Sequence, residues 1–340
     1  MTAGRVLLLV VCVVLSACGG SSPSAPTTDG LTPAFAYRGE TVSALDGSPI
    51  GRVAVRIGAQ SAVSDENGRF DLQNLAAGDG TVVISGASIV ERQKTVAVPG
   101  NGTSRETLIP ASFDLRAFDE MFRGTGRLQR WTSAPALVVL AKVMQFETFA
   151  TEDQYHATSE RLSDSETALM IEHLTEGLAL LSGNTFTRFS AITIEDPSAG
   201  SRISTLRSGS VVVGRYRGIY SLSNTIAFGR WATNGSAEVT GGAIYLDANY
   251  DRTNETRRLV RIHELGHALG YLHVTTRVSI MNPAVGPAPT EFDRQAAVIA
   301  FQRAPGNRSP DNDVADSTEM PKGGIFGTPL GRTLWSPPVF

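Results

Sequence analysis

The sequence has little cysteine, little net charge and no apolar run of membrane-spanning length. It holds two cysteines among 340 residues, Cys12 and Cys18. If a leader is removed before Cys18, only one remains, which excludes an intrachain disulfide. The net charge of −3 gives no electrostatic reason to expect a nucleic-acid partner. The apolar run at residues 6–15 is too short, at 1.5 Å per helical residue, to cross a hydrocarbon core of about 30 Å.

The N-terminus is instead typical of an exported protein. Arg5 and the apolar run have the order of a signal peptide. The following Leu15-Ser16-Ala17-Cys18 resembles a bacterial lipobox, whose cysteine is lipidated after cleavage. We therefore expect a signal peptide at 1–17, a flexible tether at 18–32, and a chain anchored by lipid in the bacterial cell envelope, at the outer membrane or the cell surface. An ordinary signal peptide with an incidental cysteine is the alternative.

Short alternating strands and turns fill residues 33–110. Val53, Val55 and Ile57 alternate with more polar positions, and Asn67-Gly68 is a strong tight-turn dipeptide. This spacing predicts a small β-sandwich. The stretch also resembles the carboxypeptidase regulatory-like sandwich modules. No residue in it suggests catalysis, so we interpret it as a spacer or docking domain.

The remaining segments predict a second domain of the α+β class. Polar, arginine-rich residues at 111–130 are expected to be a connector, followed by a domain at 131–304. Ser163 and Glu166 have capping-box spacing at the start of an amphipathic helix that ends near Gly183. His173 lies off the apolar stripe of this helix and His156 is expected in a polar loop, so both are expected at the surface rather than as metal ligands. Residues 305–340 are expected to be a mostly disordered tail, because they are rich in Pro, Gly, Asn and Asp.

Three of the five histidines fall within "HELGHALGYLH" at 263–273. His263 and His267 are one helical turn apart and can face one ion. His273 would lie about 9 Å further along a continuous helix, beyond the reach of that ion. It joins the pair only if the helix ends between them, and Gly270 permits that turn because glycine accepts left-handed backbone angles.

Three histidines predict a catalytic zinc site, since they leave a fourth position for water. Zinc lowers the pKa of that water and polarises a carbonyl. Glu264 follows the first ligand and can take the water's proton without binding the metal. A solvated helix with a chance histidine cluster is the alternative for the motif.

The full motif, followed by Met281 in "SIMNP", resembles the metzincin metallopeptidases, and the order of segments over 130–303 is closest to the matrixins. The resemblance implies that Met281 forms a Met-turn and that Asp293 is structural. It also implies that a protein or peptide substrate lies extended along an edge strand at 225–231. Asp247 matches a family aspartate and is a candidate calcium ligand, although a turn at the start of a helix explains it equally well. No histidine occurs between Phe186 and Arg261, so a second, structural zinc is not expected.

These observations favour a lipid-anchored zinc metalloendopeptidase in which Glu264 activates a metal-bound water. A surface-anchored binding or adhesion lipoprotein with a vestigial zinc domain is the main alternative. Zinc hydrolysis of a non-peptide amide is a third. The physiological substrate and the oligomeric state have no signal in the sequence.

Overall fold

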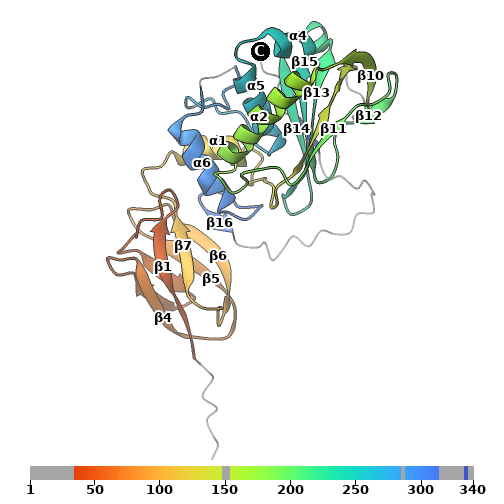
Figure 1. Cartoon of the computed structure of the whole chain (residues 1–340). Helices are drawn as coiled ribbons and strands as arrows, with labels where there is room; N and C mark the ends of the chain where they lie inside the picture. Colours follow the sequence, from red (N-terminus) through yellow and green to blue (C-terminus); the bar gives the residue numbers. More distant parts are fainter. Residues whose placement is uncertain (1–33, 148–153, 285–287, 314–332, 336–340) are drawn as a thin grey trace, which may run out of the picture. The chain divides into compact units, whose positions relative to one another are not determined.

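The computed structural model describes residues 34–147, 154–284, 288–313 and 333–335 (Figure 1). The predicted signal peptide and tether, with Cys18, lie outside the described residues. Among the described residues, no helix is both long and apolar enough to cross a membrane.

Residues 34–110 form two β-sheets that share one apolar core. Val53, Val55 and Ile57 are buried and Arg56 is exposed, so the alternation in the sequence sets the buried face as predicted. Gly68 has a φ of +78° in the Asn-Gly turn. The smaller sheet has the order β4-β1-β7 and the larger β16-β6-β5-β2-β3. Their strands are β1 (Phe35–Ser43), β2 (Ala54–Ile57), β3 (Gln60–Val63), β4 (Arg69–Leu75), β5 (Gly78–Ser85), β6 (Arg92–Val98), β7 (Ser104–Leu108) and β16 (Asn312–Asp313).

Two segments differ from their expected roles. Residues 111–130, expected as a connector, contain helix α1 (Leu115–Arg123), and Phe118 and Phe122 of this helix are buried in the largest apolar core. Residues 305–313, expected in a disordered tail, are folded: β16 pairs with β6, and Asp311 is fully buried. Polar composition predicted disorder there, but Arg92 of β6 and Arg303 after α6 (Glu291–Phe301) supply hydrogen-bond partners for Asp311 at 2.7–3.0 Å.

A large mixed sheet forms the centre of the second half of the chain. Its strand order is β12-β10-β9-β13-β15-β14-β17, and β8 pairs with β13 and with β11. The inner pairs β8–β13 and β13–β15 are parallel, whereas β14 runs antiparallel to β15. The strands are β8 (Ala136–Leu140), β9 (Lys142–Gln145), β10 (Gln154–Arg161), β11 (Ile192–Glu195), β12 (Arg202–Ser204), β13 (Ser210–Arg217), β14 (Ala227–Thr233), β15 (Val239–Asp247) and β17 (Thr333–Trp335). The chain thus combines several sheets with few helices.

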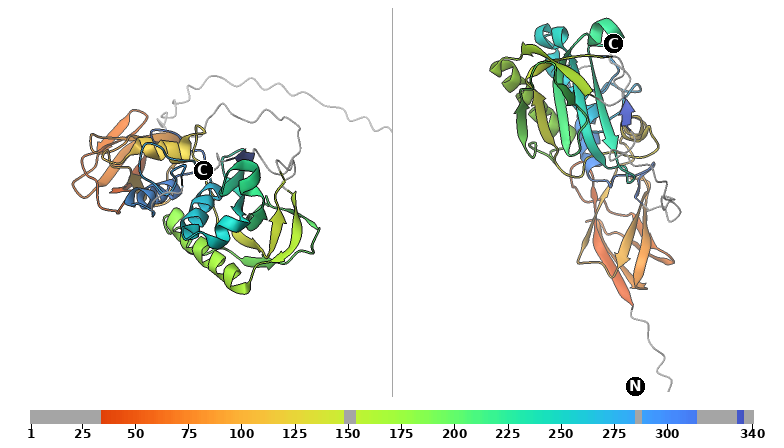
Figure 2. Two further views of the ribbon diagram at one scale, coloured as in Figure 1. Left: turned by 90° about the horizontal axis from the view of Figure 1, so that it is seen from above. Right: turned by 90° about the vertical axis from the view of Figure 1, so that its right-hand side faces the viewer.

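Helices α2 (Asp164–Leu181) and α5 (Arg257–Ala268) lie beside each other against this sheet (Figure 2). The predicted capping box of Ser163 and Glu166 is present at the start of α2. Leu174, Leu178 and Leu181 of α2 are fully buried, and such side chains stabilise a fold by about 1.5–3 kcal/mol each. The short helices α3 (Ile219–Ser223) and α4 (Ala248–Thr253) flank β14 and β15 in the sequence.

The expectation for His173 was wrong. Its side chain is buried, and its Nδ1 lies 3.2 Å from Nη1 of Arg261 on α5. The amphipathic pattern placed His173 outside the leucine stripe of α2, but α5 covers that side of the helix as well.

Candidate metal centre

Helix α5 ends where the sequence requires it to end. Its last residue is Ala268, and Gly270 has a φ of +103°. The N–H of Gly270 donates to the carbonyl of His267, and that of Tyr271 donates to the carbonyl of Gly266, each at 2.9 Å. These bonds close the last turn of the helix, and the chain then turns back towards the site.

Neighbouring segments fix the turn at Gly270. A Cβ atom at Gly270 would lie 2.8 Å from the carbonyl oxygen of Gln129. The side chain of Gln129 in turn accepts a hydrogen bond from Nε1 of Trp231 at 2.7 Å. The N–H of Leu272 donates to the carbonyl of Met121 in α1 at 2.8 Å. The predicted connector therefore helps to hold the segment that carries His273.

His263, His267 and His273 converge on one point. Their Nε2 atoms lie 3.1–3.2 Å from one another. Nδ1 of His263 lies 2.6 Å from the carbonyl of Ile280, and Nδ1 of His267 lies 2.7 Å from that of Tyr271. A neutral imidazole that donates from Nδ1 carries a lone pair on Nε2, so these two rings turn their lone pairs towards a common centre.

This geometry fits a tetrahedral zinc ion. Ligand nitrogens at 2.0–2.1 Å from a tetrahedral metal are about 3.3–3.4 Å apart, close to the separations observed here. Desolvation lowers the pKa of His263 and of His273 to about 4, and lowers that of His267 well below its ordinary value. The three rings are therefore neutral near pH 7, as metal ligation requires. No other set of three such side chains meets in this way within the described part of the chain.

Glu264 directly follows His263 on α5 and is fully buried. Neither of its carboxylate oxygens has a hydrogen-bond partner. Burial raises the pKa of this carboxyl well above its usual value. Buried polar groups without partners are rare and costly in folded proteins, so the carboxyl is suited to act on a ligand or water rather than to stabilise the fold.

Met281 and Asp293 contact the segments that carry the histidines. Met281 is fully buried, and a Cβ atom at Gly266 of α5 would lie 2.5 Å from its Sδ. Asp293 of α6 accepts hydrogen bonds from the hydroxyl of Ser279 at 2.5 Å and the N–H of Ile280 at 3.1 Å. Because the carbonyl of Ile280 accepts from His263, Asp293 supports one of the three histidines through this loop.

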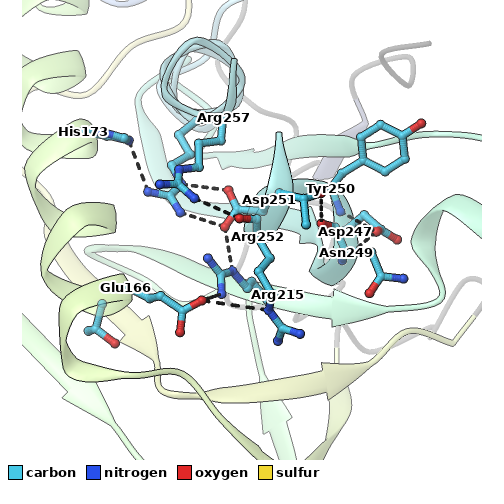
Figure 3. Close-up of polar contacts among 12 residues, drawn as sticks. Glu166, His173, Arg215, Asp247, Asn249, Tyr250, Asp251, Arg252 and Arg257 are labelled. Atoms are coloured by element: carbon cyan, nitrogen blue, oxygen red, sulfur yellow. Dashed lines mark hydrogen bonds and ion pairs between the residues drawn. The ribbon is translucent and has the colours of Figure 1, made fainter. Parts of the chain in front are cut away.

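Asp247 occupies a helix start. Its Oδ1 accepts from the N–H groups of Asn249 and Tyr250, and its Oδ2 accepts from the N–H of Tyr220 at 2.9 Å (Figure 3). Of the two explanations considered for this aspartate, the structure supports the N-cap of α4. The calcium expectation gains no support from the described residues.

The predicted substrate strand is β14, at Ala227–Thr233 rather than 225–231. It passes close to the histidines, because a Cβ atom at Gly229 would lie 2.5 Å from Cβ of His267. Strand β17 pairs antiparallel with its outer edge, with Trp335 opposite Arg230. Sequence reasoning anticipated neither feature. A glycine within a strand is a weak signal of close backbone approach, and the C-terminal apolar residues gave no indication of where they would pair.

Comparisons with known proteins add little. No family model matches the chain, and no curated protein matches it. Among solved structures, chains of two type II cohesin–X-dockerin complexes from Acetivibrio cellulolyticus, an N-terminal and a C-terminal interface mutant, are each 25% identical to it. Each match covers 22% of this chain and 55% of the other, with a TM-score of 0.19. The chain thus spans about half of those chains, and so low a score says nothing about function.

Proposed function

We propose that this chain is a zinc-dependent metalloendopeptidase of the metzincin type, closest to the matrixins. The convergence of three neutral imidazoles, two of them buried, carries this proposal together with the buried carboxyl of Glu264 on the same helix, which has no hydrogen-bond partner. His263, His267 and His273 would hold the zinc. The lipobox at Cys18 would anchor the enzyme in the bacterial cell envelope.

Zinc bound at this site would supply Lewis acidity that polarises a substrate carbonyl and acidifies water. The charge of a bound zinc ion would favour the ionised form of Glu264 over the neutral form that burial favours. The carboxylate, whose oxygens have no other partners, would then accept a proton from the attacking water and pass it to the leaving amine. An extended peptide would add to the outer edge of β14, where main-chain hydrogen bonds hold it independently of side-chain identity. Met281 and the loop held by Asp293 would keep His263 oriented.

The test compares the wild-type chain with Glu264→Gln, which preserves the shape of the side chain. Both should bind one zinc by mass spectrometry. Hydrolysis of casein or of a peptide library should fall by about 10²- to 10⁴-fold in the variant, the usual contribution of a positioned acid–base group. Glu172→Gln, at an exposed position of α2, is the matched control and should leave hydrolysis unchanged.

Substoichiometric zinc in the wild type, or hydrolysis that is the same in Glu264→Gln, would show that the proposal is wrong. Binding of glycans or proteins by residues 33–110, with no hydrolysis by the full chain, would favour the binding lipoprotein instead. Cleavage confined to non-peptide amides would favour a zinc amidase that acts on such amides.

A further inference from the structure

A cluster of buried charge joins α5 to β13 and α4. It consists of Arg215 of β13, Asp251 of α4 and Arg261 of α5, whose side chains are at most 3% exposed (Figure 3). Buried charges are costly unless they are paired and hydrogen-bonded. None of these three residues takes part in the proposed catalytic steps.

Asp251 joins the two arginines. Its Oδ1 accepts from Nε of Arg261 at 2.8 Å, and its Oδ2 accepts from Nη2 of Arg261 at 2.7 Å and from Nε of Arg215 at 2.6 Å. Burial raises the pKa of the Asp251 carboxyl, but Arg261 and Arg215 outweigh it and hold the pKa below its usual value. The pair with Arg261 is therefore a charged, two-pronged contact that fixes orientation as well as distance.

The cluster also joins α5 to α2. Nη1 of Arg215 pairs with Glu166 at 2.5 Å, and Nη1 of Arg261 lies 3.2 Å from His173. Arg261 is thus held from α4 and from α2 at once. The cap of α5 provides no comparable restraint, because the side chain of Thr256 makes no capping hydrogen bond.

Helical geometry relates this contact to the metal centre. At 100° per residue, Arg261 projects about 160° from His263 and about 120° from His267. It therefore restrains one side of α5 while both histidines extend from the other. A ligand nitrogen about 6–7 Å from the helix axis moves about 1 Å when the helix rotates by 10°, whereas zinc–nitrogen distances tolerate about 0.2 Å.

We propose that Arg261 and Asp251 are positioning residues for the metal centre: their two-pronged contact sets the rotation of α5 and so the convergence of His263 and His267. This inference rests on the proposed zinc site. The three Nε2 atoms lie 3.1–3.2 Å from one another, and α5 carries two of the three rings, so a fixed rotation of α5 keeps those two in place. Zinc binding then costs little rearrangement.

The experiment measures zinc affinity by competition with a chromophoric chelator in the full chain. Arg261→Lys retains the positive charge and removes the guanidinium that makes the two-pronged contact with Asp251. Arg258→Lys is the matched control, because Arg258 makes a similar two-pronged contact from α5 to Glu176 of α2, but at 43% and 47% exposure. Circular dichroism establishes a temperature at which every metal-free variant is folded.

Arg261→Lys should weaken zinc binding by about tenfold or more, the lower end of what contacts supporting metal ligands contribute. Arg258→Lys should change it less than about twofold. A purely structural role would lower the unfolding temperature of metal-free Arg261→Lys and leave its zinc affinity at the wild-type value, and that result would overturn the inference.

If Arg261→Lys does not fold, the triple variant Arg215→Met/Asp251→Leu/Arg261→Met replaces the whole cluster with apolar side chains of similar size, a change that buried ion pairs and triads often tolerate. It should also bind zinc at least about tenfold more weakly, and wild-type affinity would again refute the positioning role. Failure of the wild type to bind stoichiometric zinc would instead refute the proposed function.

Discussion

Replacement of Gly270 by valine should weaken zinc binding while keeping all three histidines and Glu264. The φ of +103° at Gly270 lies where L residues are strained by about 1–3 kcal/mol. The added Cβ would also lie 2.8 Å from the carbonyl of Gln129 and 3.0 Å from Cγ2 of Val239. A metal-free variant can relieve this strain by shifting the turn, and His273 then moves with it.

Zinc binding must restore the strained turn, so the strain appears as lost affinity. At about 1.4 kcal/mol for each factor of ten, 1–3 kcal/mol corresponds to a dissociation constant raised by about 5- to 150-fold. Chelator competition measures it, and circular dichroism shows that the variant is folded. Gly126→Val is the control, since Gly126 has a φ of +93° but no atom within 4 Å of an added Cβ. It should lose stability and keep zinc affinity. A folded Gly270→Val variant with wild-type affinity would refute this account of the turn.

Two further predictions concern residues beyond α6. A chain that ends at Arg332 lacks β17, and the outer edge of β14 is then free of its paired strand. It should show a lower KM for an extended peptide than a chain that ends at Trp335. Equal KM values would show that β17 does not compete with the peptide. Asp311→Asn should lower the free energy of unfolding by about 3–5 kcal/mol, because the buried Arg92 and Arg303 lose their shared partner. Asp71→Asn, which loses the exposed pair with Arg38, is the control and should change the free energy of unfolding by less than about 1 kcal/mol. Urea titration measures both variants, and equal losses would contradict the structural role given to Asp311.

Features that depend on local spacing could be predicted from the sequence. The alternation around Val55 gives a strand, and Ser163 with Glu166 gives a helix start, because each depends on neighbours within four residues. The convergence of His263, His267 and His273 follows from one helical turn and one glycine. These parts of the fold and of the candidate site are encoded within short stretches of the chain.

Features that depend on distant partners could not be predicted. Asp311 is polar and lies in a stretch rich in Pro, Gly and Asn, yet it is buried because arginines 219 and 8 residues away meet it. The contact of Arg261 with Asp251 likewise depends on how α4 and α5 pack. Local composition measures how much apolar surface a segment can bury, and it does not register a buried ion pair.

The pairing of β17 with β14 also bears on how activity would depend on concentration. Thr333–Trp335 belongs to the same chain as the edge it pairs with, so its effective concentration there does not change when the protein is diluted. A free peptide must compete against a tethered occupant, and its apparent affinity is the intrinsic affinity multiplied by the fraction of time that the edge is uncovered. The free-energy cost of displacing β17 is large relative to the binding free energy of a short peptide, whereas a long unfolded substrate can offset it through contacts beyond β14. Tethering would thus lower the apparent affinity of every competing peptide by the same factor, and long chains would still bind at concentrations at which short peptides do not.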